Sequence, residues 1–199
     1  DQLLEEARRT LQLAAVVGRT FTHDLLAWLS SAAALMAHLD GNLAALQRTE
    51  LIRERARLPE LEYIFKHVMV RDVAYESLLL RDRRTYHSLI GRHLEEIYAG
   101  QKLEEVYELL AHHYNLSDDH AKALEYLLKS GDKARLAYAN PEAIAFYRQA
   151  MQLAEHLQQA EAAVSIAEGL GDVLFHVGES EEALACYERA LTCCGDAKR

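Results

Sequence analysis

Hydrophobic residues recur at helical spacing along most of the chain. Over residues 3–15 they return every three or four positions, and Gly18 follows as a stop signal. Thr22 is a suitable N-cap for a second helix, and the apolar pattern predicts a third helix over residues 32–47. The chain is therefore expected to begin with three helices.

The period changes from helical to alternating between residues 51 and 65. Leu61, Tyr63 and Phe65 alternate with Glu62, Ile64 and Lys66, and a charged stretch containing Pro59 separates them from Leu51 and Ile52. This pattern predicts two short strands joined by a charged loop. Three helices closed by a β-hairpin predict a winged-helix domain over residues 1–80. Helical spacing then resumes and predicts a connecting helix over residues 81–102.

The second half contains an internal repeat. In three segments a small residue stands 12 positions before an alanine, which is followed four positions later by a bulky residue; these triplets are Ala111, Ala123 and Leu127; Gly131, Ala143 and Tyr147; and Gly171, Ala183 and Tyr187. Small residues at such places let antiparallel helices approach closely. The stretches "EEALACYERAL" and "PEAIAFYRQAM" resemble the tetratricopeptide repeat. The resemblance implies a repeat array over residues 103–199.

The repeat departs from the 34-residue period of that family. Its alanines are 20 and then 40 positions apart, which predicts one long helix over residues 119–138, shared by two units. The fold class expected for the whole chain is mostly α: a winged-helix module with a small β-hairpin, followed by a tetratricopeptide-like α-helical repeat array.

Composition supports a mostly α protein, because the 199 residues are 50% hydrophobic and include only two prolines and nine glycines. Three cysteines cannot form a disulfide framework, so we expect a reduced, cytoplasmic protein. No apolar run approaches the ~20 residues of a membrane span. The sequence begins with Asp rather than Met, and we expect it to be a fragment of a longer protein.

Charge makes nucleic acid an unlikely partner. The net charge is −9, and residues 100–199 carry 17 Asp and Glu against 9 Lys and Arg. The predicted third helix has one acid and one base, and the arginines of the hairpin, Arg53, Arg55 and Arg57, stand among glutamates. One alternative stays open: a DNA-binding winged helix of a transcriptional regulator with an oligomerising helical tail.

Three stretches carry a wider resemblance: "LQLAAVVGRTFTHDLLAWLS", "YIFKHVMVRDVAYESLLLRDRRTYHSLIGRHLEEIY" and "LLAHHYNLSDDHAKALEYLLKSGDKA". Together they resemble the region that follows the ATPase module in bacterial signal-transduction ATPases with numerous domains. The nearest branches are proteins linked to class III adenylate or guanylate cyclases and large transcriptional regulators. In that family an upstream module binds ATP and Mg²⁺, the winged helix packs on it, and the repeats sense a ligand or partner.

The resemblance implies a non-catalytic regulatory and protein–protein interaction fragment, which couples a nucleotide-binding module to a repeat-based sensor. The fragment itself is expected to hold no cofactor. Its expected partners are the upstream ATPase domain of the same chain and a protein or peptide bound by the repeats. The intact protein would also carry an effector such as a nucleotide cyclase.

His67 is the position at which the resemblance points to a site. It matches the family's histidine after the wing, which lies close to the phosphates of the bound nucleotide, so His67 and Arg71 are nucleotide-sensing candidates. The alternative is a histidine that only caps or packs. Arg71 and Asp72 could pair with His67 or with each other.

Repeat stacks bind along the face built by the first helix of each unit. Transferring that geometry gives a candidate peptide-binding face of nine residues: Glu108, His112, Asn115, Asp132, Arg135, Glu168, Asp172, Phe175 and His176. The face is acidic with one aromatic, which suits a basic or amphipathic peptide. The alternative is that this face packs against other domains.

The chain shows no sign of reaction chemistry. It contains no GxxxxGKS, GxxxxGKT or GxSxG sequence. His112, His113 and His120 lack the i, i+4 spacing of a helical metal pair. We therefore expect neither catalytic residues nor a metal site in this fragment.

Overall fold

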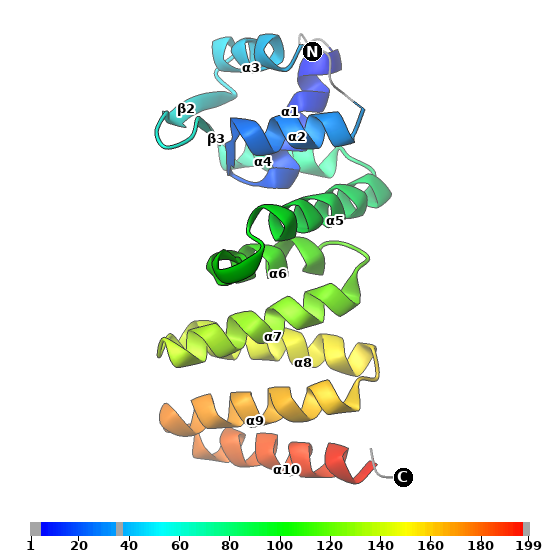
Figure 1. Cartoon of the computed structure of the whole chain (residues 1–199), viewed down its shortest axis with the longest axis vertical. Coiled ribbons are helices and arrows are strands. Elements are labelled where there is room, and N and C mark those ends of the chain that lie inside the picture. Colours follow the sequence, from blue (N-terminus) through cyan, green and yellow to red (C-terminus); the bar gives the residue numbers. More distant parts are fainter. Residues whose placement is uncertain (1–4, 35–37, 197–199) are drawn as a thin grey trace. The chain divides into compact units, whose positions relative to one another are not determined.

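The computed structural model describes residues 5–34 and 38–196, and it is mostly helical with one small sheet (Figure 1). The chain divides into two compact units. Unit 1 comprises residues 1–93 with 116–118, and unit 2 comprises residues 94–115 with 119–199. The boundary between residues 93 and 94 falls inside the segment that the sequence predicted as a connecting helix.

Unit 1 begins with three helices, which are α1 (Glu5–Val17), α2 (His23–Ala32) and α3 (Leu39–Arg48). Gly18 ends α1 at a φ of 148°, and its amide donates to the carbonyl of Ala14. The hydroxyl of Thr22 accepts a hydrogen bond from the amide of Leu25, which confirms Thr22 as the N-cap of α2. Leu3, where the first helix was expected to begin, lies outside the described residues.

The prediction of a helix over residues 32–47 is wrong at its start. Ala32 is the last residue of α2, and Ala33 caps that helix. Ala34 has a φ of 55° and His38 a φ of 59°, and such left-handed residues cannot continue an α-helix. Residues 35–37 lie outside the described part. The alanines give this stretch a high helix propensity, but the chain turns here so that α3 begins only at Leu39.

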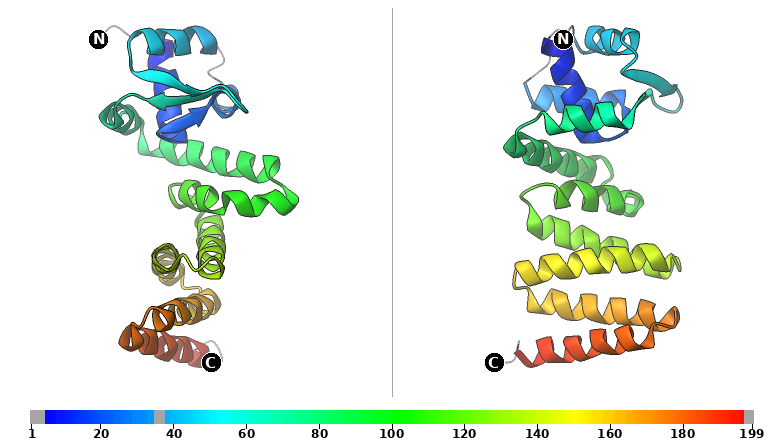
Figure 2. Two further views of the ribbon diagram at one scale, coloured as in Figure 1. Left: turned by 90° about the vertical axis from the view of Figure 1, so that its left-hand side faces the viewer. Right: turned by 180° about the vertical axis from the view of Figure 1, so that it is seen from behind.

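The sheet is antiparallel, with strand order β1-β3-β2; its strands are β1 (Thr20–Thr22), β2 (Ile52–Ala56) and β3 (Glu62–Phe65) (Figure 2). Ile52 opposes Phe65 across the β2–β3 hairpin, which confirms the two predicted strands. The third strand, β1, was not predicted, because three residues are too few to show an alternating pattern. Phe21 of β1 stacks on Tyr63 of β3 and lies in the core.

Two helices follow the sheet, α4 (Val68–Glu76) and α5 (Leu80–Ile97). Helix α4 packs against α1. Only Ala74 of α4 is buried, whereas His87 and Ile90 of α5 are fully buried. Helix α4 is therefore a surface helix whose apolar residues are largely open to solvent.

Unit 2 holds a 3₁₀ helix and a series of helices that alternate in direction (Figure 1): η1 (Gly100–Val106), α6 (Tyr107–Asn115), α7 (His120–Leu136), α8 (Asn140–His156), α9 (Ala160–His176) and α10 (Ser180–Asp196). Helix α7 packs against both α6 and α8. This confirms one long helix in the place that the sequence predicted.

The repeat of unit 2 is a single helix of 17 residues followed by a three-residue connection. This 20-residue step explains why the alanines of the sequence pattern stand 20 and 40 positions apart. The fourth residue of each helix is a buried alanine, namely Ala123, Ala143, Ala163 and Ala183. Ala163 does not show the sequence pattern, because Met151, 12 positions before it, is not small and Ala167, four positions after it, is not bulky.

The three connections from α7 to α10 use the same backbone turn. Tyr138, Gln158 and Gly178 stand 20 positions apart, and each has a positive φ, of 58°, 56° and 89°. The residue after each donates its amide to a carbonyl five positions earlier, as in Ala139 to Ala134. This is the Schellman ending of an α-helix. The uniform ending repeats the same chain reversal between each helix and the next.

Close packing between these helices depends on glycine beneath tyrosine. Tyr147 of α8 is fully buried, and a Cβ at Gly131 of α7 would lie 2.9 Å from its ring. A Cβ at Gly169 of α9 would lie 2.8 Å from the same ring, and one at Gly171 would lie 2.7 Å from Tyr187 of α10. The glycines therefore leave the space that the tyrosine rings fill.

Candidate interaction surfaces

His67 stands at the N-cap position of α4, with extended backbone and no capping hydrogen bond from its side chain. The side chain is exposed. Next to it, Lys66 pairs with Glu50 at 2.6 Å and lowers the pKa of that carboxyl, and the charge of His67 adds a smaller effect of the same sign. His67 is thus accessible to a partner of this unit.

Arg71 lies one turn after His67, and it belongs to a packed cluster. Its Nη1 is 3.0 Å from Asp72, and its guanidinium lies 5.5 Å from the ring centre of Tyr75. The guanidinium of Arg83 covers the same ring at 4.8 Å, and the Tyr75 hydroxyl is 3.0 Å from Nε2 of the buried His87. The expected pairing of Arg71 with Asp72 is confirmed. Nothing in the described part bonds Arg71 to His67.

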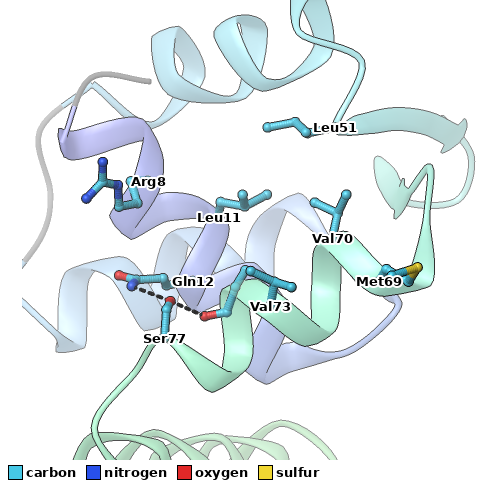
Figure 3. Close-up of a pocket in the computed structure, with 9 residues that line it drawn as sticks. Arg8, Leu11, Gln12, Leu51, Met69, Val70, Val73 and Ser77 are labelled. Atoms are coloured by element: carbon cyan, nitrogen blue, oxygen red, sulfur yellow. Dashed lines mark hydrogen bonds between the residues drawn. The ribbon is translucent and has the colours of Figure 1, made fainter. Parts of the chain in front are cut away.

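An apolar groove of about 520 Å³ runs between α1 and α4 of unit 1 (Figure 3). Leu11 and Leu51 stand on one side, and Met69, Val70 and Val73 of α4 stand on the other. The polar lining residues lie together on the left in Figure 3: Arg8, and Gln12, whose amide donates to the Ser77 hydroxyl at 2.8 Å. The groove therefore offers contact almost entirely to apolar groups.

The exposed side chains of this groove are large. Met69 is 78% exposed and Val73 is 67% exposed. Single exposed apolar residues are ordinary on protein surfaces, but a contiguous apolar set around a groove marks an interaction site. Sequence reasoning missed the groove, because the spacing of Met69, Val70 and Val73 is also that of a helix buried in a core.

The nine residues of the predicted peptide-binding face all lie in unit 2 and reach the surface. The residues Glu108, His112 and Asn115 of α6 are exposed, and so are Glu168, Asp172, Phe175 and His176 of α9. Asp132 and Arg135 of α7 are half-buried. The structure thus leaves all nine side chains at least partly accessible.

Several of these nine side chains already serve the helix packing. The hydroxyl of Tyr147 donates to Asp132 at 2.6 Å, and Nε of Arg135 donates to the same hydroxyl at 3.3 Å. Burial and the bond to Asp132 raise the pKa of Tyr147 to about 12. One helix pair on, the Tyr187 hydroxyl donates to Asp172 at 2.9 Å. Asp132 and Asp172 therefore hold tyrosines and are only partly available to a ligand.

A small pocket of about 190 Å³ brings three of the nine together, Arg135, Asp172 and His176. Its other lining residues include Leu136, Tyr138 and Asn140, from the end of α7 and the start of α8. Leu136 and Tyr138 are strongly exposed. Sequence reasoning missed both, because the turn that exposes Tyr138 is set by its left-handed backbone and has no sequence signature in a tyrosine. Glu108, His112 and Asn115 do not line this pocket.

Over the residues that the structure describes, no cluster of three or more His, Cys, Asp or Glu side chains is placed to hold a metal ion. Likewise, none of the helices in the described part is long and apolar enough to cross a membrane.

Comparison with known proteins gives no relative on which to base a function. No protein-family model matches the chain, and neither a curated protein nor a solved structure matches it significantly.

Proposed function

We propose that the chain is a non-catalytic regulatory and protein–protein interaction fragment of a multidomain signalling ATPase. In this proposal unit 1 is a winged-helix module that docks on a nucleotide-binding module elsewhere in the natural protein. Unit 2 is a tetratricopeptide-like array that senses a protein or peptide. Three helices packed with an antiparallel hairpin support the first assignment, and the glycine–tyrosine packing of paired helices supports the second.

The observation that carries the proposal is the apolar groove between α1 and α4. Its exposed residues Met69 and Val73 lie on the same helix that His67 begins. A module that packed its own apolar side chains into this groove would also lie beside the imidazole of His67. Nucleotide binding in that module could then be sensed through the same contact.

The DNA-binding alternative receives less support. On the β2–β3 hairpin, Arg55 lies 3.4 Å from Glu62, and Arg57 lies 2.8 Å from Glu54. On α3, Asp40 is exposed and lies 3.0 Å from His23. Cations that are already matched by carboxylates contribute little to neutralising phosphates. Binding to duplex DNA that weakens steeply with salt would favour this alternative.

The test of docking compares two exposed positions of unit 1 in the natural multidomain protein. Val73 is 67% exposed and lines the groove, whereas Leu79 is 68% exposed and does not line it. We expect Val73→Asp to change the affinity for ATP or its turnover, and Leu79→Asp to change neither. His67→Ala, measured in parallel, tests whether the imidazole takes part.

Equal ATP binding and turnover in the wild type and Val73→Asp, with both proteins folded by circular dichroism, would refute docking through this groove. Failure of the natural protein to bind ATP would refute the ATPase assignment itself. A change in Val73→Asp without a change in His67→Ala would keep the docking surface and remove the sensing role of His67.

For unit 2 we propose that the pocket of Arg135, Asp172 and His176 is part of the peptide-binding face. The exposed Leu136, Tyr138 and Phe175 add apolar contact around it. A peptide with mixed basic and apolar side chains fits this surface, because carboxylates outnumber cations among the nine face residues. Loss of peptide binding in Asp172→Asn together with Tyr138→Ala would be the expected result, since Asn keeps an acceptor for the Tyr187 hydroxyl but removes the charge.

A further inference from the structure

The pocket of Arg135, Asp172 and His176 holds a guanidinium group whose terminal nitrogens face no close acceptor. Nε of Arg135 donates to the Tyr147 hydroxyl at 3.3 Å, and that hydroxyl donates to Asp132 at 2.6 Å. These bonds fix the direction of the guanidinium group. In the described part, Nη2 lies 3.9 Å from the carboxylate of Asp132, which is beyond hydrogen-bond distance. The Nη atoms can therefore bind a carboxylate through two parallel hydrogen bonds.

The part of the pocket that comes from α9 offers acceptors. Nδ1 of His176 lies 2.7 Å from the backbone carbonyl oxygen of Asp172. A carbonyl oxygen only accepts, so Nδ1 carries the hydrogen and Nε2 of the neutral imidazole is an acceptor. One oxygen of the Asp172 carboxylate accepts from the Tyr187 hydroxyl at 2.9 Å, and the other has no partner among the described residues. These acceptors suit an ammonium group.

The cation and the carboxylate of the pocket lie near each other. The pKa of Arg135 is raised chiefly by its hydrogen bond with Tyr147, and the charge of Asp172 adds to this effect. Asn140, which also lines the pocket, has a side-chain amide that can donate and accept. A pocket with one charge of each sign matches a ligand that also carries one charge of each sign.

Tyr138 lines the pocket in an unfavourable backbone conformation. It is 83% exposed and has a φ of 58°, which is disfavoured for a residue with a bulky side chain. Forty positions on, the same turn uses Gly178. The helix ending therefore does not require a tyrosine, and the exposed ring points to a binding role. Together with Leu136, which is 71% exposed, the ring gives the pocket an apolar side.

We propose that this pocket binds a free α-amino acid with an apolar side chain. The carboxylate of the ligand lies against the Nη atoms of Arg135, and its ammonium group donates to Asp172 and to Nε2 of His176. Its side chain contacts Leu136 and Tyr138. The pocket volume of about 190 Å³ is smaller than that of pockets for drug-sized molecules, which suits so small a ligand. The inference rests on the proposed binding face of unit 2, within which it assigns this pocket to a small molecule.

Calorimetric titration of the chain with four related compounds tests each contact. L-Leucine carries all three groups that the pocket would recognise. N-Acetyl-L-leucine lacks the ammonium group, L-leucine amide lacks the carboxylate, and glycine lacks the side chain. We expect saturable binding of L-leucine. Each of the other three should bind about tenfold more weakly or worse, because each leaves a group of the pocket without its partner.

Two pairs of variants make the result specific. Tyr138→Gly and Gln158→Gly both remove a left-handed residue with a side chain, so both should raise the urea midpoint of unit 2. Only Tyr138→Gly should also weaken the binding of L-leucine. Asp172→Asn keeps an acceptor for Tyr187 but loses the charge, and it should weaken binding about tenfold. Glu168→Gln changes the same helix outside the pocket and should leave binding unchanged.

The proposal is overturned if L-leucine shows no saturable binding at millimolar concentration, or if folded Asp172→Asn and Tyr138→Gly bind it as well as the wild type does. Equal binding of N-acetyl-L-leucine would assign the pocket to the carboxyl end of a peptide instead, and equal binding of L-leucine amide would assign it to the amino end. A chain that binds a basic, apolar peptide but no amino acid would refute this inference alone. A chain that binds L-leucine but no peptide would keep the inference and remove the peptide from the proposed function.

Discussion

Replacing Gly131 by alanine tests whether glycine beneath tyrosine holds the helices of unit 2 together. In an ordinary helix this change stabilises the protein by about 1 kcal/mol, because alanine is the better helix former. At Gly131 the new Cβ would lie 2.9 Å from Cδ1 and Cε1 of Tyr147, well inside normal contact distance. With Gly169 of α9 close to the same ring, Tyr147 has little room to move away.

The control is Gly41, a glycine inside α3 where a Cβ would meet only the Cβ of His38 at 3.8 Å. Gly41→Ala and Gly131→Ala share the gain in helix propensity, so the difference between them is the cost of the clash. Overpacking of a buried site costs about 1–3 kcal/mol. We therefore expect Gly41→Ala to raise the free energy of unfolding of unit 1. The change that Gly131→Ala makes to the free energy of unfolding of unit 2 should be lower than that gain by about 1–3 kcal/mol.

Urea unfolding measures both effects. Trp28 is the single tryptophan of the chain and lies in unit 1, so its fluorescence follows the unit that contains Gly41. Circular dichroism follows the helices of both units, so the part of its transition that Trp28 fluorescence does not share reports unit 2. In a Tyr147→Ala background the clash is absent, and there Gly131→Ala should stabilise by about 1 kcal/mol. The reasoning is refuted if Gly131→Ala stabilises the wild type as much as Gly41→Ala does, or if its cost persists without Tyr147.

Three further predictions concern unit 2, and urea unfolding checks each. Gln158→Gly should stabilise unit 2 by about 1 kcal/mol, because Gln158 is held at a positive φ that glycine adopts freely. Gly178→Ala should destabilise unit 2 by a similar amount, because Gly178 also has a positive φ. Glu95→Gln should destabilise at neutral pH: burial raises the pKa of Glu95, but hydrogen bonds from Tyr126, Lys122 and Tyr114 outweigh it and lower the pKa overall. The folded pKa is below the unfolded value of 4.5, so the stability that ionised Glu95 contributes is present above pH 4.5 and is lost as the pH falls through the folded pKa. The free energies of unfolding of the wild type and Glu95→Gln should therefore converge in acid.

Much of the helical order could be predicted from sequence, because it depends on local signals. Thr22 is a capping residue by chemical type, and the buried alanines of unit 2 recur at a fixed interval. The turn at Ala34 could not be predicted, because nothing in a run of alanines marks a residue that leaves the helix. Strand β1 could not be predicted either, since it exists only through its pairing with β3.

The candidate sites were less accessible to sequence reasoning for a different physical reason. Periodicity shows that a helix has an apolar stripe, but it does not show whether another element covers that stripe. Met69 and Val73 on α4 have the same spacing as covered residues elsewhere. Only the structure distinguishes them. The family resemblance pointed to His67. It did not point to the apolar groove, because that groove forms only where α4 packs against α1.

The position of α10 in the described part of unit 2 affects its expected dynamics. In a linear stack each helix is stabilised mainly by its neighbours. In the described part α10 packs closely on α9 and meets α8 through the ion pairs Arg148–Glu182 and Arg189–Glu155, whereas α8 packs closely on both α7 and α9. Amide hydrogens of α10 should therefore exchange faster than those of α8, because local opening costs less free energy where fewer contacts are broken. Equal exchange rates in α8 and α10, measured on the folded chain by mass spectrometry, would contradict this reasoning.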